Sequence, residues 1–156
     1  MAIGDGIIVS AEPKGMYLEG IISGTPKPGT MMQLKAATAQ VAGEYTWEVY
    51  NPNASGDPRL VAILLADELQ GGVVSQAYVS GSRGFLYCPL PGEICNILVK
   101  DVAGTGDTHA IGDRMYAEAG SGKFLVQSTS ANISQFTLLE ASTAFTADGL
   151  LAAMRS

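Results

Sequence analysis

Apolar and polar residues alternate along most of this chain, in short runs that end at glycine or proline. The stretch YTWEVY (45–50) is the clearest case, because its first Tyr, Trp and Val share one face of an extended chain and its Thr and Glu share the other. Nineteen Gly and seven Pro leave few intervals long enough for an ordinary helix. The pattern predicts further strands at FLYCPL (85–90), CNILVK (95–100), RMYAEA (114–119), KFLVQS (123–128) and FTLLEA (136–141), and short strands or extended segments at GIIVS (6–10) and GIISG (20–24).

Three stretches repeat one local pattern: PGTMMQL (28–34), PGEICNI (91–97) and IGDRMYA (111–117). Each has a glycine at its second position and apolar residues three and five positions later. Period two after a glycine turn is typical of a strand that joins a barrel or sandwich with alternate side chains inward. The side chains predicted to point inward are Met32, Leu34, Cys95, Ile97, Met115 and Ala117.

Two segments leave the choice between helix and strand open. LVAILLADELQGG (60–72) fits a helix stopped by glycine or a buried strand before a turn, and MQLKAATAQVAG (32–43) fits a strand followed by a loop. NPNASGDPR (51–59) consists of turn formers and predicts an exposed loop. We therefore expect an all-β (mainly β) chain with at most one or two short helices. Its predicted organisation is an extended N-terminal arm (1–27) and a single small β-barrel-like domain (28–156) with an inserted hairpin around 42–59.

Composition narrows the classes of function. Hydrophobic residues make up 47% of the 156 residues and charged residues only 15%, which excludes disorder and indicates a surface partly covered by neighbouring molecules. The nine Lys and Arg are scattered in a chain of net charge −6, which argues against nucleic-acid binding. The longest apolar run, VAILLA (61–66), is too short for a membrane helix, and the N-terminus lacks the pattern of a signal peptide. We expect synthesis and retention in a cytoplasm.

The string AGSGK (119–123) invites a phosphate-binding interpretation. A phosphate loop of the Walker type needs glycine at the position of Ala117 and a hydroxyl residue at the position of Phe124. Both are missing, and the following residues favour a strand. The two glycines instead predict a hairpin turn, with Lys123 as a solvated charge. The Gly104-x-Gly106 pair has His109 where a dinucleotide motif needs its third glycine, so we interpret 103–112 as a surface loop.

No group of residues calls for chemistry. His109 is the only histidine, so a Ser-His-Asp or Cys-His mechanism would have to use it; beside Asp107 on a Gly-rich loop it is predicted to be a solvated side chain. Cys88 and Cys95 are predicted to be small buried hydrophobes, although a bridge between them is conceivable. No metal-ligand spacing occurs. We predict no catalytic residue, no metal and no cofactor.

The middle of the chain resembles a known family. The segments RLVAILLADELQGG (59–72), AYVSGSRGFLYCPLPGEICNILVKD (77–101) and AIGDRMYAEAGSGKFLV (110–126) together resemble the small head decoration (cement) proteins of tailed bacteriophages. The resemblance covers roughly Arg59 to Val126. It implies a β-barrel or β-tulip core, a more variable N-terminal part, and homotrimers at three-fold positions of the capsid exterior that clamp neighbouring major capsid proteins.

A decoration protein needs contact surfaces and no nucleophile, and neither nucleic acid nor membrane is an expected partner. Rival interpretations are another virion component (a tail, baseplate or fibre-bearing head protein), a carbohydrate-binding module that stacks a sugar on aromatic rings, and an enzyme that relies on His109. The candidate interaction residues are the apolar residues of the arm and three aromatic residues near the inserted hairpin: Ile3, Ile7, Ile8, Val9, Tyr17, Leu18, Tyr45, Trp47 and Tyr50.

Overall fold

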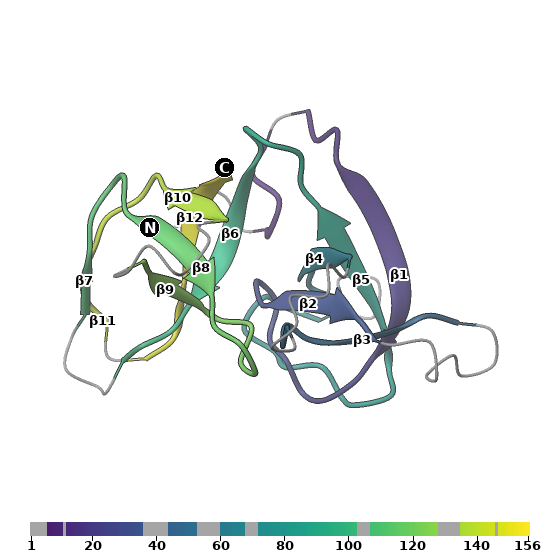
Figure 1. The fold of residues 1–156 in the computed structure, drawn as a ribbon. Helices are drawn as coiled ribbons and strands as arrows, with labels where there is room; N and C mark the ends of the chain where they lie inside the picture. Colours follow the sequence, from purple (N-terminus) through teal and green to yellow (C-terminus); the bar gives the residue numbers. More distant parts are fainter. Residues whose placement is uncertain are drawn as a thin grey trace.

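The structure is a computed structural model that describes residues 6–10, 12–35, 44–52, 60–67, 72–102, 107–127, 135–145 and 147–156. Within these ranges every regular element is a β-strand, which confirms the all-β prediction (Figure 1). None of the described residues forms a helix long and apolar enough to cross a membrane. The strands are β1 (Met16–Ile22), β2 (Met31–Leu34), β3 (Thr46–Val49), β4 (Val61–Leu64), β5 (Arg83–Cys88), β6 (Ile94–Val99), β7 (Asp107–His109), β8 (Arg114–Ala117), β9 (Phe124–Val126), β10 (Phe136–Leu138), β11 (Ser142–Phe145) and β12 (Gly149–Arg155).

The strands close into two barrels that lie side by side (Figure 1). The order β1-β3-β2-β4-β5 closes the first, here called the N-barrel, and the order β10-β12-β6-β9-β8 closes the second, the C-barrel. β7 and β11 form a separate two-stranded sheet. The sequence predicts a single barrel-like domain, because the alternation marks each strand without showing which strands pair over long distances.

The predicted arm contains a barrel strand. β1 lies within residues 1–27, pairs antiparallel with β5 along its length and pairs parallel with β3 at its end. The pattern is hidden because a glycine occupies an inward position of the strand. A side chain at Gly20 would collide with the Trp47 indole, whose nearest atom lies 2.7 Å from the place of a Cβ. Residues 16–22 are therefore part of the N-barrel and not an extended arm.

The strands β2, β4 and β5 are buried on both faces. On β4 the adjacent residues Ile63 and Leu64 are both fully buried, but they belong to different cores. Leu64 points into the N-barrel, and Ile63 points out of it toward the C-barrel. This double burial explains the continuous apolar run VAIL and excludes the helical alternative for 61–64. The loop predicted at 51–59 falls mostly outside the described residues. The hairpin predicted as an insertion around 42–59 is described over 44–52, where β3 pairs with β1 and β2, so this part is a strand of the N-barrel and not an insertion.

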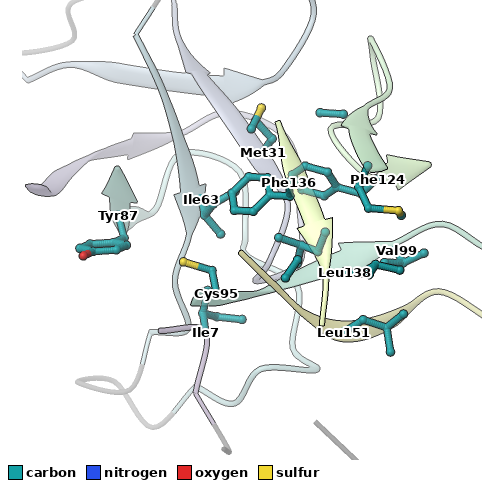
Figure 2. Packing of buried hydrophobic residues seen from close by; sticks show 14 residues of the cluster. Ile7, Met31, Ile63, Tyr87, Cys95, Val99, Phe124, Phe136, Leu138 and Leu151 are labelled. Carbon is teal, nitrogen blue, oxygen red and sulfur yellow. The ribbon is translucent and has the colours of Figure 1, made fainter. Parts of the chain in front are cut away.

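One core fills the C-barrel and continues onto the outer face of the N-barrel (Figure 2). The rings of Phe124 and Phe136 meet edge to face in this core, with centroids 5.3 Å apart. The second core lies inside the N-barrel and contains Ile22, Met32, Trp47, Ala62, Leu64, Tyr78 and Leu86. The first, which we call the shared core, contains Ile7, Met31, Ile63, Tyr87, Cys95, Ile97, Val99, Met115, Ala117, Phe124, Phe136, Leu138, Leu151 and Ala153.

The predicted glycine turns are confirmed. Gly29, Gly92 and Gly112 all have positive φ, between 84° and 93°, and of the six side chains predicted to point inward five are buried and Leu34 is partly buried. The β8–β9 hairpin is also confirmed, with positive φ at Gly120 and Gly122. This hairpin joins the barrels, because the amide of Met31 donates to the carbonyl of Gly122 at 2.8 Å.

Candidate interaction surface

The predicted interaction residues divide into exposed and buried groups. Tyr17 and Tyr45 are 59% and 57% exposed, whereas Ile7 and Trp47 are only 3% and 2% exposed. Ile7 and Trp47 are core residues, and the buried Trp47 ring offers no platform for stacking a sugar. Burial of the indole follows from its inward position on β3, where it packs against the backbone of Gly20. Of the remaining candidates, Ile3 lies outside the described residues and the others are partly exposed: Ile8, Val9, Leu18 and Tyr50.

A buried carboxylate joins the start of β1 to the turn between β5 and β6. Glu93 accepts hydrogen bonds from the backbone amide of Lys14, from the amide of Gly15 at 3.1 Å, from the Tyr87 hydroxyl at 2.8 Å and from the amide of Leu90 at 2.6 Å. Burial alone would raise the pKa of Glu93, but these four donors favour the charged form and hold its pKa below the usual range. The group is an ionised structural anchor.

Sequence reasoning missed Glu93 as an anchor and recorded only a Pro-Gly turn at that place. Two of its donors are backbone amides 78 and 79 positions away along the chain. Backbone donors leave no mark in a sequence, so no local pattern could have indicated this network.

Exposed apolar side chains surround the same turn. Met16 lies opposite Cys88 on β5, and Met154 of β12 lies opposite Ile94 at the start of β6. Leu90 lies in the turn between these strands, and it and Met16 are each about half exposed. We call Met16, Leu90 and Met154 the tip patch, because they lie around the turn that connects β5 of the N-barrel to β6 of the C-barrel. Exposed apolar groups gathered in one place are typical of a contact surface.

The histidine is buried, contrary to the prediction of a solvated loop residue. His109 is 5% exposed and belongs to β7, where it is paired with Ser142 of β11. A cavity of about 350 Å³ borders it, with Lys100 and Tyr116 also in the lining. The ammonium of Lys100 is already engaged by Glu118 at 2.7 Å. The sequence missed β7, which has only three residues and follows a glycine-rich stretch.

The cysteines are unbridged. Cys95 is buried as predicted, whereas Cys88 is only partly buried, contrary to the prediction. Burial, and next the nearby Glu93 carboxylate, raise the pKa of the Cys95 thiol to about 12, so this thiol stays protonated at neutral pH. Among the residues described here, no group of three His, Cys, Asp or Glu side chains could hold a metal ion.

Lys123 is paired, contrary to the prediction of a solvated hairpin charge. Its ammonium lies 2.5 Å from a carboxylate oxygen of Asp148, and both side chains are about one-third or less exposed. The next residue, Phe124, is fully buried in the shared core. The AGSGK string therefore builds a hairpin and an ion pair at the edge of the C-barrel.

Comparison with known proteins finds a likeness at the level of fold. No protein-family model matches the chain, and no curated protein sequence matches it. Among solved structures, the N base of the head fibre gp8.5 of bacteriophage phi29 is similar, with a TM-score of 0.54 and 8% sequence identity. The alignment covers 91% of this chain and 94% of that chain, so both barrels fall within it. At this identity the likeness shows the fold alone.

Proposed function

We propose that this chain is a structural protein of the head of a tailed bacteriophage, which binds the outside of the assembled shell and stabilises it as a decoration protein. The observation that carries the proposal is the full-length likeness to the N base of a phage head fibre. The resemblance of residues 59–126 to head decoration proteins supports the same role from a separate source, the sequence.

The proposed partner is the major capsid protein, contacted by a homotrimer of this chain. Tyr17 and Tyr45 supply the exposed aromatic area that docking on the shell would cover. A trimer that bridges several shell subunits gains affinity through effective concentration even if each contact is modest. Because it binds the assembled shell and not free subunits, it stabilises the shell by mass action.

The proposal includes no catalytic step. The only histidine is buried in a strand, and the Cys95 thiol is held protonated. The binding surfaces proposed here require neither group.

A second candidate is the base of a fibre that projects from the head, and the phi29 likeness favours it specifically. Both candidates place the chain on the shell, but they differ in consequence. A decoration protein raises the stability of the shell, whereas a fibre base occupies it and holds a further chain.

Co-sedimentation with empty expanded shells tests the proposal. The shells would be assembled from the major capsid protein encoded in the same genome, and bound chain would be measured as its concentration rises. We expect saturation at a fixed ratio to capsid subunits and a higher melting temperature of decorated shells. Binding with no gain in shell stability would favour the fibre base, and no saturable binding would refute both.

Matched variants identify the docking surface in the same assay. Tyr17→Ala combined with Tyr45→Ala removes the two exposed aromatic residues and is expected to weaken binding at least tenfold. Ile111→Ala removes an apolar side chain that is 68% exposed on the C-barrel and serves as the control with little effect. Binding of the double tyrosine variant that equals that of the wild type would exclude the tyrosines from the interface.

A further inference from the structure

The first described segment, residues 6–10, acts as an extra strand on β6. Ile8 lies opposite Cys95, the amide of Val9 donates to Ile94 at 3.0 Å, and the amide of Asn96 donates to Ile7 at 2.7 Å. The amide group of the Asn96 side chain also donates to the carbonyl of Gly6 at 2.6 Å. β9 pairs with β6 only at Val99. The segment thus completes the open edge of β6, with Ile7 inserted into the shared core.

Hydrogen bonds hold the chain at two points, at the end of the segment and just before β1. The Ser10 hydroxyl accepts a hydrogen bond from the amide of Ile94 at 2.8 Å, and Glu93 holds the amides of Lys14 and Gly15. Only residues 11–13 connect the two anchored points, and the last of them is Pro13. Four Cα-to-Cα steps span at most about 14 Å, so this connection is a short hinge. Short hinges favour the exchange of an element between copies.

The segment packs mainly on the C-barrel. A cavity of about 340 Å³ lies between it and the N-barrel, lined by Ile8 on one side and by Tyr17 and Leu65 on the other. If the segment came from another copy, its hydrogen bonds to β6 and the burial of Ile7 would be reproduced residue for residue. Exchange therefore keeps the contacts that hold the segment.

We propose that residues 6–10 of one copy pair with β6 of a neighbouring copy, and that this exchange links the protomers of the assembly. The short hinge requires Ser10, bound to the neighbour's Ile94, to lie within about 14 Å of its own Lys14, so the β5–β6 turns of the two copies must lie close together. That contact covers the tip patch, whose exposed side chains lie around the same turn. Passing each segment to the next copy closes a ring. The number of three copies rests on the proposed function; the exchange itself does not.

A cysteine pair distinguishes exchange from pairing within one chain. Ile8 and Cys95 form a non-hydrogen-bonded antiparallel pair, because the backbone hydrogen bonds run between their flanking residues. Cα atoms of such a pair lie about 4.5 Å apart, within the range that a disulfide spans. The variant is Ile8→Cys in a Cys88→Ser background, which leaves Cys95 as the single partner. The control adds Cys95→Ala and should form no cross-link.

After oxidation, non-reducing denaturing electrophoresis and intact-mass measurement report the arrangement. We expect covalent dimers and trimers, both in solution and on decorated shells. A monomer that carries an internal disulfide would overturn the exchange. If oxidation yields neither product, a photo-reactive benzoylphenylalanine at position 8 replaces the cysteine; cross-links between chains are expected, and cross-links confined to one chain would overturn the exchange equally.

The outcome is separable from the proposed function. Shell binding is measured independently with the unmodified chain. Saturable binding together with internal disulfides would reject the exchange and leave the decoration role standing. Cross-linked oligomers that never bind shells would keep the exchange and reject the decoration role.

Discussion

The two barrels differ in how their interiors are completed. The N-barrel closes around its own side chains, with Trp47 and Leu64 at the centre. The interior of the C-barrel continues through Phe136 onto Ile63 and Tyr87, which belong to the outer face of the N-barrel. The N-barrel therefore has a core made of its own residues, whereas part of the C-barrel's core is made of residues from the N-barrel. A barrel can thus be closed by its own backbone hydrogen bonds and still need residues of another barrel to complete its hydrophobic core.

The strongest test of this difference uses two neighbouring residues of β4. Ile63→Ala and Leu64→Ala each remove a fully buried side chain, and each should lower the free energy of unfolding by about 2–5 kcal/mol. Native-state hydrogen exchange should separate them. Ile63→Ala is expected to reduce protection in β6 and β12 as well as in β4, and Leu64→Ala mainly in β2, β4 and β5. Identical protection patterns would contradict the division into two cores.

The joint between the barrels can be strained at one glycine. A Cβ at Gly122, where φ is 62°, would lie 2.3 Å from the carbonyl oxygen of Met31. We expect Gly122→Ala to cost about 2–5 kcal/mol through backbone strain and displacement of the N-barrel. At Gly120 φ is also positive, but a Cβ would meet nothing within 4 Å, so Gly120→Ala should cost about 1 kcal/mol. If urea unfolding gave Gly122→Ala a loss of stability as small as that of Gly120→Ala, the joint would tolerate the added methyl group.

Glu93 links the two barrels at their other end. Glu93→Gln keeps the size of the side chain but removes the charge that four donors satisfy, and it should cost about 2–3 kcal/mol at neutral pH. Glu12→Gln, at an exposed position nearby, is the matched control and should change stability by less than about 0.5 kcal/mol.

The pH dependence of the same variant has a definite sign. The pKa of Glu93 is lowered in the folded chain, so its contribution is complete above the ordinary value of about 4.3 and is lost as pH falls through the folded value. The difference in unfolding free energy between wild type and Glu93→Gln should shrink in acid below about pH 4. A difference that stays constant down to pH 2 would mean that the charge of Glu93 is not what holds Lys14 and Gly15.

The smallest effect is expected at the hairpin ion pair. Lys123→Gln removes a partly exposed partner of Asp148 and should cost about 1 kcal/mol or less, with a smaller loss in 1 M salt because the pair is screened. Arg83→Gln removes a more exposed guanidinium that pairs with Glu19 and with Glu44, and it should cost less still. If Lys123→Gln lowered the free energy of unfolding by more than about 2 kcal/mol, this ion pair would stabilise the contact between the hairpin and β12 more strongly than we expect.

Local features of the fold could be predicted from sequence, and long-range ones could not. Gly92, Gly112 and the AGSGK turn act on their own neighbours, so their patterns reveal them. The partition into two barrels depends on pairings such as β1 with β5, which join residues more than 60 positions apart. The Glu93 anchor and the burial of His109 depend on equally remote partners.

Electron cryo-microscopy of heads assembled with this chain tests the central claim most directly. The account predicts density for two adjacent barrels on the outer surface of the shell, in groups of three at its three-fold positions. Density for the chain on the tail only, or heads whose outer surface lacks it at saturating concentration, would contradict the account.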